Sequence, residues 1–488
     1  MTKDNSILNG YCTILAALLG GAMGMLILRY ERAALSLIAL PFGVMAVRAL
    51  TPALAKSLRL LKELSWWHAL WFCMMLSGLV FRIRTSEAAN TNPLDFLAVF
   101  RLGLVAVMGF VLLYRLMLRK PDWVHFLIKG LPGLLTAYTV TCLLSVMWST
   151  YPLWTFYKST EYLVDIALLA AVIASIHSIH DIKTFFDWTW LLLSSLIVTV
   201  WIGVLIWPDL AVLHDVGMLG FAIRGVFPAF ETNGVGELSA ILASVAITRI
   251  IFHPHHRALY FLVLLVALTT SILTQSRSPL LGLCVAAVLI LFASRRVGLL
   301  VAIPVAVSAI FMLTSSLDQL GTFLLRGQRD EDFTSLSGRT NLWVLGWEMF
   351  KIRPFLGYGA YAGGRFTGIA DTMAAGNSSI LNTWLEIVLG VGLPTGLLMV
   401  AAFVMAWAIL IKQVCTTTQD DVTHCLTVEA LGVLAIISVR SMFTVHLIWH
   451  PPIAFFLVVG YAEYLRRTCT KSLHENTVSP QFLFAARR

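Results

Sequence analysis

The sequence predicts an all-α, polytopic integral membrane protein with about fourteen transmembrane helices and one long extracytoplasmic loop that carries short helices. Hydrophobic residues make up 58% of the 488 residues and charged residues only 12%, which lies far from the averages of soluble domains. Apolar windows of about 17 to 25 residues recur from Tyr11 to Tyr464, and each could cross about 30 Å of hydrocarbon as a helix. We therefore expect no separate globular domain.

The order of these windows predicts where the chain crosses the membrane. The predicted spans lie near residues 9–29, 33–50, 65–82, 97–117, 129–147, 160–177, 185–207, 234–252, 258–275, 278–293, 298–315, 382–411, 425–445 and 452–465. Basic residues then gather in every second loop, as the positive-inside rule requires. These loops contain Lys56, Arg59, Lys62, Arg119, Lys120, Lys183, Arg257, Arg295, Arg296, Lys412, Arg466, Arg467 and Lys471. We therefore expect both termini on the cytoplasmic side and residues 316–381 as the longest extracytoplasmic loop.

The net charge of +9 follows from this loop pattern and does not predict nucleic acid as a partner. Three regions are expected: an N-terminal transmembrane bundle over 1–145, a core over 146–411 that includes the loop 316–381, and a C-terminal transmembrane pair with a cytoplasmic tail over 412–488. The first apolar run lacks a small-residue cleavage pattern and is interpreted as a retained span. No CxxC spacing or His/Cys cluster predicts a metal site, and no cofactor is expected.

Arginines at the outer face are the first candidate site residues. A single arginine there is usually an interfacial anchor, but several from different segments favour a binding site. Ser276-Arg277-Ser278-Pro279 opens one span and places Arg277 at a positive helix end, where the macrodipole favours an anion. The sequence leaves two interpretations of Arg277 open: contact with lipid phosphate, and membership of a phosphate-binding site. The arginines predicted at or near this face are Arg224, Arg277, Arg339, Arg365 and Arg440.

A short helix is predicted in the long loop, begun by the stretch Ser337 to Trp343 and ended by Pro354. Trp343 and Trp347 lie on one side of it, which is typical of a helix at the membrane interface. The aromatic side is more typical of packing than of sugar stacking. Arg339 lies in the first turn, again where a helix end favours an anion.

Polar residues follow at the start of the span near 382–411. Asn382 and Glu386 lie one helical turn apart on the same face. A carboxylate this close to the membrane either forms hydrogen bonds within the bundle or takes part directly in catalysis. Both interpretations remain open for Glu386.

Short motifs between residues 145 and 400 occur in a recognisable order. They are Trp148-Ser149 with Pro152, Arg224-Gly225 followed by Asn233-Gly234, Thr274-Gln275-Ser276-Arg277, Ser337-Gly338-Arg339 with Trp343, and Pro354 to Gly359. Together these motifs resemble the bacterial O-antigen ligase and polymerase superfamily, whose members transfer glycans from undecaprenyl diphosphate outside the cytoplasmic membrane. The resemblance implies that Arg277 and Arg339 are the two functional arginines.

One position departs from the family pattern. The resemblance implies a His-Asn pair about nine residues ahead of a Gly-rich turn. This chain has Leu381-Asn382 there, followed by Gly392 and Thr395. Since the family histidine engages the acceptor hydroxyl, the proton acceptor stays open among Glu386, His446 and His450.

The resemblance implies an inverting, metal-independent transfer in which two guanidinium groups stabilise the diphosphate leaving group. Candidate catalytic residues are Arg277, Arg339 and Glu386, and candidate substrate-binding residues are Arg224, Arg365, Asn382, Trp343, His446 and His450.

The implied partners are an undecaprenyl-diphosphate-linked glycan, a lipid-linked or lipid A core acceptor, a chain-length regulator and a flippase. The expected location is the bacterial inner membrane. A polysaccharide polymerase is favoured because the family histidine is absent. A divergent ligase that attaches glycan to lipid A core or protein, a transporter or flippase, and an inactive paralogue are the alternatives. The transporter is disfavoured because no internal repeat is evident.

Overall fold

The computed structural model describes residues 64–79, 96–118, 123–214, 219–254, 257–299, 339–364, 379–417 and 422–478. The predicted spans near 9–29 and 33–50 lie outside these residues, as do nearly all of the span near 298–315, most of the loop 316–381, and Arg365. Each of the other predicted spans corresponds to a described helix. The described part of the chain is mostly helical, in agreement with the predicted fold class.

The long helices are α3 (Trp66–Leu79), α5 (Phe96–Leu118), α6 (Gly130–Leu144), α7 (Pro152–Ser175), α8 (Ile179–Ile206), α10 (Thr232–Phe252), α11 (Arg257–Leu273), α12 (Arg277–Ala293), α16 (Arg339–Ile352), α18 (Thr383–Thr416), α19 (Val422–Ser441) and α21 (Ile453–Val478). The short elements are the 3-10 helices η2 (Val124–Leu127) and η3 (Ser145–Trp148), the helices α9 (Pro208–Ala211) and α20 (His446–Trp449), and the strands β1 (Val212–His214) and β2 (Phe221–Ile223).

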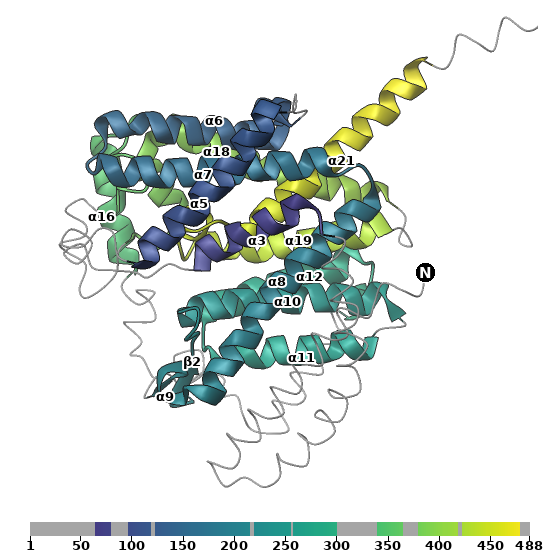
Figure 1. The fold of residues 1–488 in the computed structure, drawn as a ribbon. Helices are drawn as coiled ribbons and strands as arrows, with labels where there is room; N and C mark the ends of the chain where they lie inside the picture. The colour runs from purple at the N-terminus through teal and green to yellow at the C-terminus, as the bar shows by residue number, and fades with distance from the viewer. Residues whose placement is uncertain are drawn as a thin grey trace, which may run out of the picture.

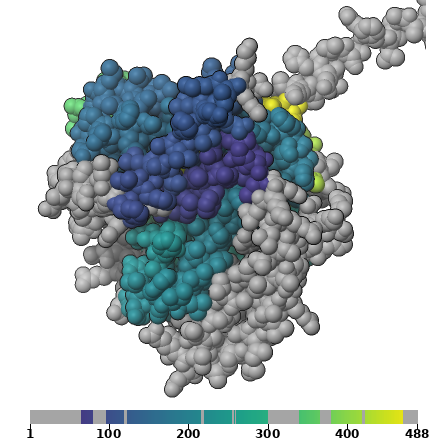
Figure 2. Space-filling view, in the orientation of Figure 1, coloured from purple at the N-terminus to yellow at the C-terminus, as the bar shows by residue number. Residues whose placement is uncertain are grey.

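Among the described residues, 6 helices are long and apolar enough to cross a membrane, and α11 and α12 are shorter apolar helices. The outer side of α5 shows why these helices need a bilayer. Phe96, Phe110 and Met117 are 80%, 70% and 83% exposed, and α5 lies at the surface of the bundle in the space-filling view (Figure 2). Such an apolar face is unfavourable in water and is satisfied by lipid.

The helices form two groups joined by α19. Figure 1 shows α6, α7 and α18 in one group and α10, α11 and α12 in the other. Helix α19 packs against α10 and α12 on one side and against α18 and α21 on the other. Its residues are buried almost throughout, because it has protein neighbours on every side. The carboxyl end of α19 therefore lies where both groups meet.

Helix α18 is broken within the predicted span, and the break determines how the preceding loop packs. Gly392 has φ 75°, and Pro394 follows it inside the helix. A helix normally pairs the carbonyls of Leu389 and Gly390 with the amides of residues 393 and 394, but proline has no amide hydrogen. The amides of Tyr358 and Gly359 donate to these two carbonyls instead, at 3.0 and 2.8 Å.

The same loop packs against the segment between α6 and α7. Trp148 donates its indole N–H to the Leu356 carbonyl at 2.8 Å, and the Thr150 amide donates to the Tyr358 carbonyl at 2.9 Å. A Cβ on Gly359 would lie 2.2 Å from Ser149 Oγ, so only glycine fits there. The motifs Trp148-Ser149 and Pro354 to Gly359 therefore form one packed junction with the break in α18.

A small hairpin adds strand structure that the sequence did not predict. Strands β1 and β2 pair antiparallel, with Val212 opposite Ile223. The side-chain amide of Gln275 donates to the Phe221 carbonyl. This hydrogen bond holds the hairpin near the turn between α11 and α12.

Candidate functional site

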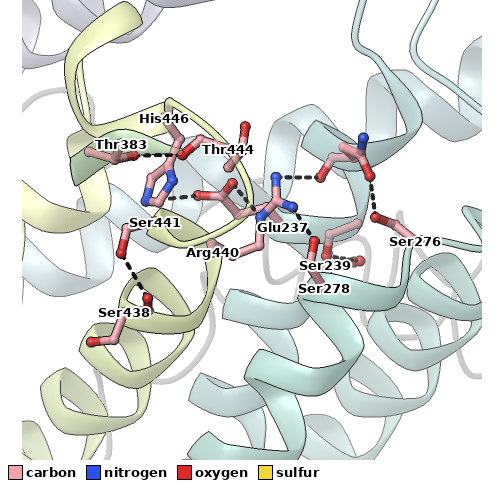
Figure 3. A network of polar contacts seen from close by, with 12 residues as sticks. Glu237, Ser239, Ser276, Ser278, Thr383, Ser438, Arg440, Ser441, Thr444 and His446 are labelled. Atoms are coloured by element: carbon pink, nitrogen blue, oxygen red, sulfur yellow. Dashed lines mark hydrogen bonds and ion pairs between the residues drawn. The ribbon is translucent and has the colours of Figure 1, made fainter. Parts of the chain in front are cut away.

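A polar network joins the amino-terminal ends of α10 and α12 to the carboxyl-terminal end of α19, with Arg440 at its centre (Figure 3). Arg440 Nε donates to Glu237 Oε2 at 3.1 Å, and Nη1 donates to Ser278 Oγ at 2.6 Å. Nη2 donates to the Asn233 carbonyl at 3.4 Å. The Arg440 side chain is only 3% exposed. A cation this deeply buried requires such partners, because its desolvation is costly.

The local sequence explains why these groups meet. Asn233 and Glu237 lie one turn apart on α10 and so share a face. Ser276, the residue before α12, donates its hydroxyl to Asn233 Oδ1 at 2.5 Å. A Cβ on Gly236 would lie 3.1 Å from Ser276 Cβ and 3.1 Å from Pro279 Cγ. Glycine at 236 therefore lets α10 approach the first turn of α12 closely.

Arg277 is the first residue of α12, as predicted, and is half-buried. Its two neighbours are both tied to the network: Ser276 bonds to Asn233 and Ser278 accepts from Arg440. These bonds fix the start of α12 against α10 and α19. Arg277 thus adds a second guanidinium beside the network, at a helix end that favours anions.

His446, the first residue of α20, is the network's imidazole. Its Nε2 lies 4.0 Å from Glu237 Oε1. The side chains of His446 and Glu237 are 14% and 17% exposed, so both reach accessible surface. Burial lowers the pKa of His446, the Glu237 carboxylate opposes that shift, and Arg440 adds to it. The imidazole is therefore neutral near pH 7 and can accept a proton.

The start of α18 holds the turn that carries His446. Thr383 Oγ1 donates to the Thr444 carbonyl at 2.6 Å. Asn382 Nδ2 donates to the Met442 carbonyl at 3.2 Å, and Asn382 Oδ1 accepts the Leu385 amide at 3.1 Å. Asn382, a predicted substrate-binding residue, is thus the N-cap of α18 and a support for the turn before α20.

Glu386, a predicted catalytic residue, lies deeper. Its Oε1 accepts the Gly364 amide at 3.0 Å and its Oε2 accepts the Ile380 amide at 3.2 Å. Glu386 is 1% exposed. Because both oxygens bond to loop backbone, this geometry favours hydrogen bonding within the protein over direct catalysis. Catalysis by Glu386 stays a prediction.

Arg339 and Trp343 lie one turn apart on α16, and the structure confirms the helix that the sequence predicted there. Trp343 packs toward Phe443, with ring centroids 6.3 Å apart. Phe443 lies in the turn before α20. Because residues four apart share a helix face, Arg339 is on the side of α16 that faces this turn. Trp343 therefore serves packing, as the sequence suggested, whereas Trp347 is 52% exposed.

The remaining predicted residues have other surroundings. Arg224 Nε donates to the Leu210 carbonyl at 2.8 Å, which ties the hairpin to α9.

His450 lies near a second buried cluster, where Lys158 donates to the Trp449 carbonyl at 2.7 Å and pairs with Glu161. Burial lowers the pKa of His450 well below its usual range, and the charges of Arg101 and Lys158 lower it further. His446 and His450 thus face different clusters.

Glu237 is the residue that the sequence reasoning missed. It is a carboxylate near the amino-terminal end of a predicted span, one turn after Asn233, and that placement was the available signal. From the sequence, its partner Arg440 is predicted only as one of the arginines at or near the outer face. The two residues lie 203 positions apart in the chain.

Fold and site together define an α-helical membrane protein with a cationic and ionisable site where the ends of α10, α12 and α19 meet. Residues 261–401 match a family model described as O-Antigen ligase, which confirms the resemblance to the O-antigen ligase superfamily. The match extends from α11 into α18 and includes Arg277, Arg339 and Glu386. No curated protein matches the chain.

Proposed function

We propose that the protein is a membrane glycosyltransferase of bacterial surface-polysaccharide biosynthesis, which takes its glycan from undecaprenyl diphosphate on the extracytoplasmic face. The observation that supports this most is the O-antigen ligase match over 261–401. Within it, Arg277 opens α12 beside the Arg440 network. The proposed location is the inner membrane, with fourteen spans and both termini cytoplasmic, because that arrangement places the basic loops on one side.

In the proposed reaction, the acceptor hydroxyl attacks C1 of the sugar from the side opposite the diphosphate. The bond between C1 and the phosphate oxygen breaks, its electron pair stays with the diphosphate, and C1 is inverted. Arg277 and Arg339 stabilise the charge that develops on the leaving group. Two guanidinium groups in a water-poor site supply this stabilisation without a metal.

A polymerase, with a lipid-linked glycan as acceptor, is the favoured form of this function. Leu381 stands where the family has its histidine, so acceptor activation differs from that of a family ligase. Leu381 also has φ 56°, in the left-handed region that leucine rarely adopts. A ligase that uses lipid A core or protein as acceptor remains the second candidate, because the donor arginines are the same.

The test is reconstitution of the purified protein in liposomes with an undecaprenyl-diphosphate oligosaccharide. Wild-type protein should produce a ladder of lengthened glycans, and Arg277→Ala and Arg339→Ala should each lower the rate by about 100-fold or more. Arg257→Ala is the matched control, because Arg257 is exposed at the start of α11, the opposite end from the network. Single transfer to lipid A core would identify a ligase. Movement of lipid-linked glycan across the bilayer without transfer would identify a transporter instead.

A further inference from the structure

We propose that His446, positioned by Glu237, takes the proton of the acceptor hydroxyl in place of the histidine that the family has at position 381. The inference rests on the proposed function. It starts from the observation that neither ring nitrogen of His446 has a hydrogen-bond partner within the part of the chain that the structure describes. Buried ring nitrogens that lack hydrogen bonds are unfavourable, so this imidazole is suited to form a hydrogen bond with a ligand.

Position 381 and His446 belong to adjoining segments. Asn382, next to Leu381, donates to the Met442 carbonyl, and Thr383 donates to the Thr444 carbonyl. These bonds lay residues 381–383 alongside the turn that leads into α20. The imidazole of His446 on α20 and a histidine side chain at position 381 would therefore lie on two adjoining segments and serve the same part of the site.

The other two candidates are less suitable. Glu386 is 1% exposed, and each of its oxygens already accepts a backbone amide. His450 is set toward the cluster of Arg101 and Lys158, two cations that oppose its protonation. His446 has a carboxylate 4.0 Å away, which stabilises the imidazolium that proton transfer creates.

The charged groups that act on His446 in the described structure are Glu237 of α10 and Arg440 of α19. Arg440 binds Glu237 Oε2, and this leaves Oε1 as the oxygen nearest His446. Glu237 is therefore a positioning residue: it orients the ring and balances its charge, while Arg440 holds Glu237 in place. The arrangement also connects to the donor side, since Arg440 binds Ser278 next to Arg277.

The proton balance of the step is simple. As the acceptor oxygen bonds to C1 and the phosphate oxygen leaves, the hydroxyl proton moves to a ring nitrogen of His446. The resulting imidazolium faces the Glu237 carboxylate and releases the proton to water after product leaves. Both ring nitrogens are covered in this structure, so the side chain must turn to meet the hydroxyl. Among the described residues, no hydrogen bond to the ring opposes that turn.

The experiment compares His446→Gln, Glu237→Gln and Glu386→Gln in the liposome assay, with His214→Gln as control because His214 is exposed on the outer hairpin. His446→Gln should lower kcat by about 100-fold or more, the usual contribution of a general base. Binding of the undecaprenyl-diphosphate donor, measured by competition with a fluorescent donor, should be unchanged. Imidazole added to His446→Ala should restore part of the rate.

The pH profile separates catalysis from a merely structural role. Wild-type activity should fall at low pH as His446 is protonated, and that decline should be absent from the residual activity of His446→Gln. Glu237→Gln should move the decline in activity to lower pH, because the neutral amide no longer stabilises the imidazolium. Glu237→Asp keeps a carboxylate and should return the decline part of the way to its wild-type pH.

If His446→Gln transfers glycan at the wild-type rate and Glu386→Gln does not transfer it, this inference is overturned and the proposed function stays intact. Absence of both donor binding and transfer in wild-type protein would remove the proposed function, and the inference with it.

Discussion

Arg440 Nη1 lies 2.6 Å from the hydroxyl oxygen of Ser278, the residue that follows Arg277. Through this bond one buried guanidinium links the carboxyl end of α19 to the first turn of α12. The same guanidinium binds Glu237 on α10. Three helices that carry candidate site residues are thus held in register by one side chain.

Replacement of Arg440 should therefore destabilise the protein strongly. Arg440→Met leaves the Glu237 carboxylate without its cation, and a broken buried pair costs about 3 to 5 kcal/mol. Thermal unfolding in detergent would measure the loss. Arg440→Met combined with Glu237→Leu should recover part of the stability, because no buried charge is then left unpaired. Equal stability of the single and double variants would contradict this account of the pair.

Gly392 should tolerate no side chain. A Cβ there would lie 2.0 Å from the Phe355 carbonyl oxygen, and φ is 75°. Gly392→Ala should lower the melting temperature and separate the Pro354 to Gly364 loop from the break in α18, with increased proteolysis of that loop.

Gly103→Ala is the matched control, because no atom lies within 4 Å of its added Cβ. Alanine is favoured over glycine within helices, so this change should be neutral or slightly stabilising. If the two variants have the same melting temperature, the close contact at Gly392 is not structurally important.

The sequence predicted the helices better than it predicted the site, for a physical reason. A helix that crosses lipid must be apolar over its whole length, so α5 and α10 coincide with predicted spans to within a few residues. The partners of a side chain depend on tertiary packing. Asn382 and Glu386 are predicted on one helix face, but Asn382 is the N-cap that precedes α18. Nothing local reveals that Glu386 accepts amides from Gly364 and Ile380. Likewise, no local pattern joins Glu237 to Arg440.

Stability should fall at acidic pH because of His446. Its pKa in the folded protein is lowered, mainly by burial, from the ordinary value of 6.5. Above that value both folded and unfolded states hold a neutral imidazole, so this residue adds no pH dependence. As pH falls below 6.5 the unfolded state binds the proton first, and the folded state loses relative stability. Melting temperatures at pH 7.5 and 5 should differ less for His446→Gln than for wild-type protein, whereas His214→Gln should match wild type. An unchanged difference in His446→Gln would mean that His446 does not titrate in this way.

Position 381 provides a test of where acceptor activation resides. If His446 has replaced the family histidine, Leu381→His in a wild-type background should change the rate little, because a proton acceptor is already present. In a His446→Gln background the same substitution should restore transfer by 10-fold or more, within the usual range for a general base. Leu381→Gln is the control for polarity at this site and should restore nothing.

Two results would contradict this view of Leu381. Restoration by Leu381→Gln would show that space or polarity, and not proton transfer, limits the His446→Gln variant. Transfer that is absent in wild-type protein but appears in Leu381→His would identify the chain as an inactive relative that kept its donor arginines. The positive φ of Leu381 bears on both variants, because histidine tolerates the left-handed region better than leucine does. Leu381→His should therefore fold at least as well as wild type, and its melting temperature would establish this before any rate is interpreted.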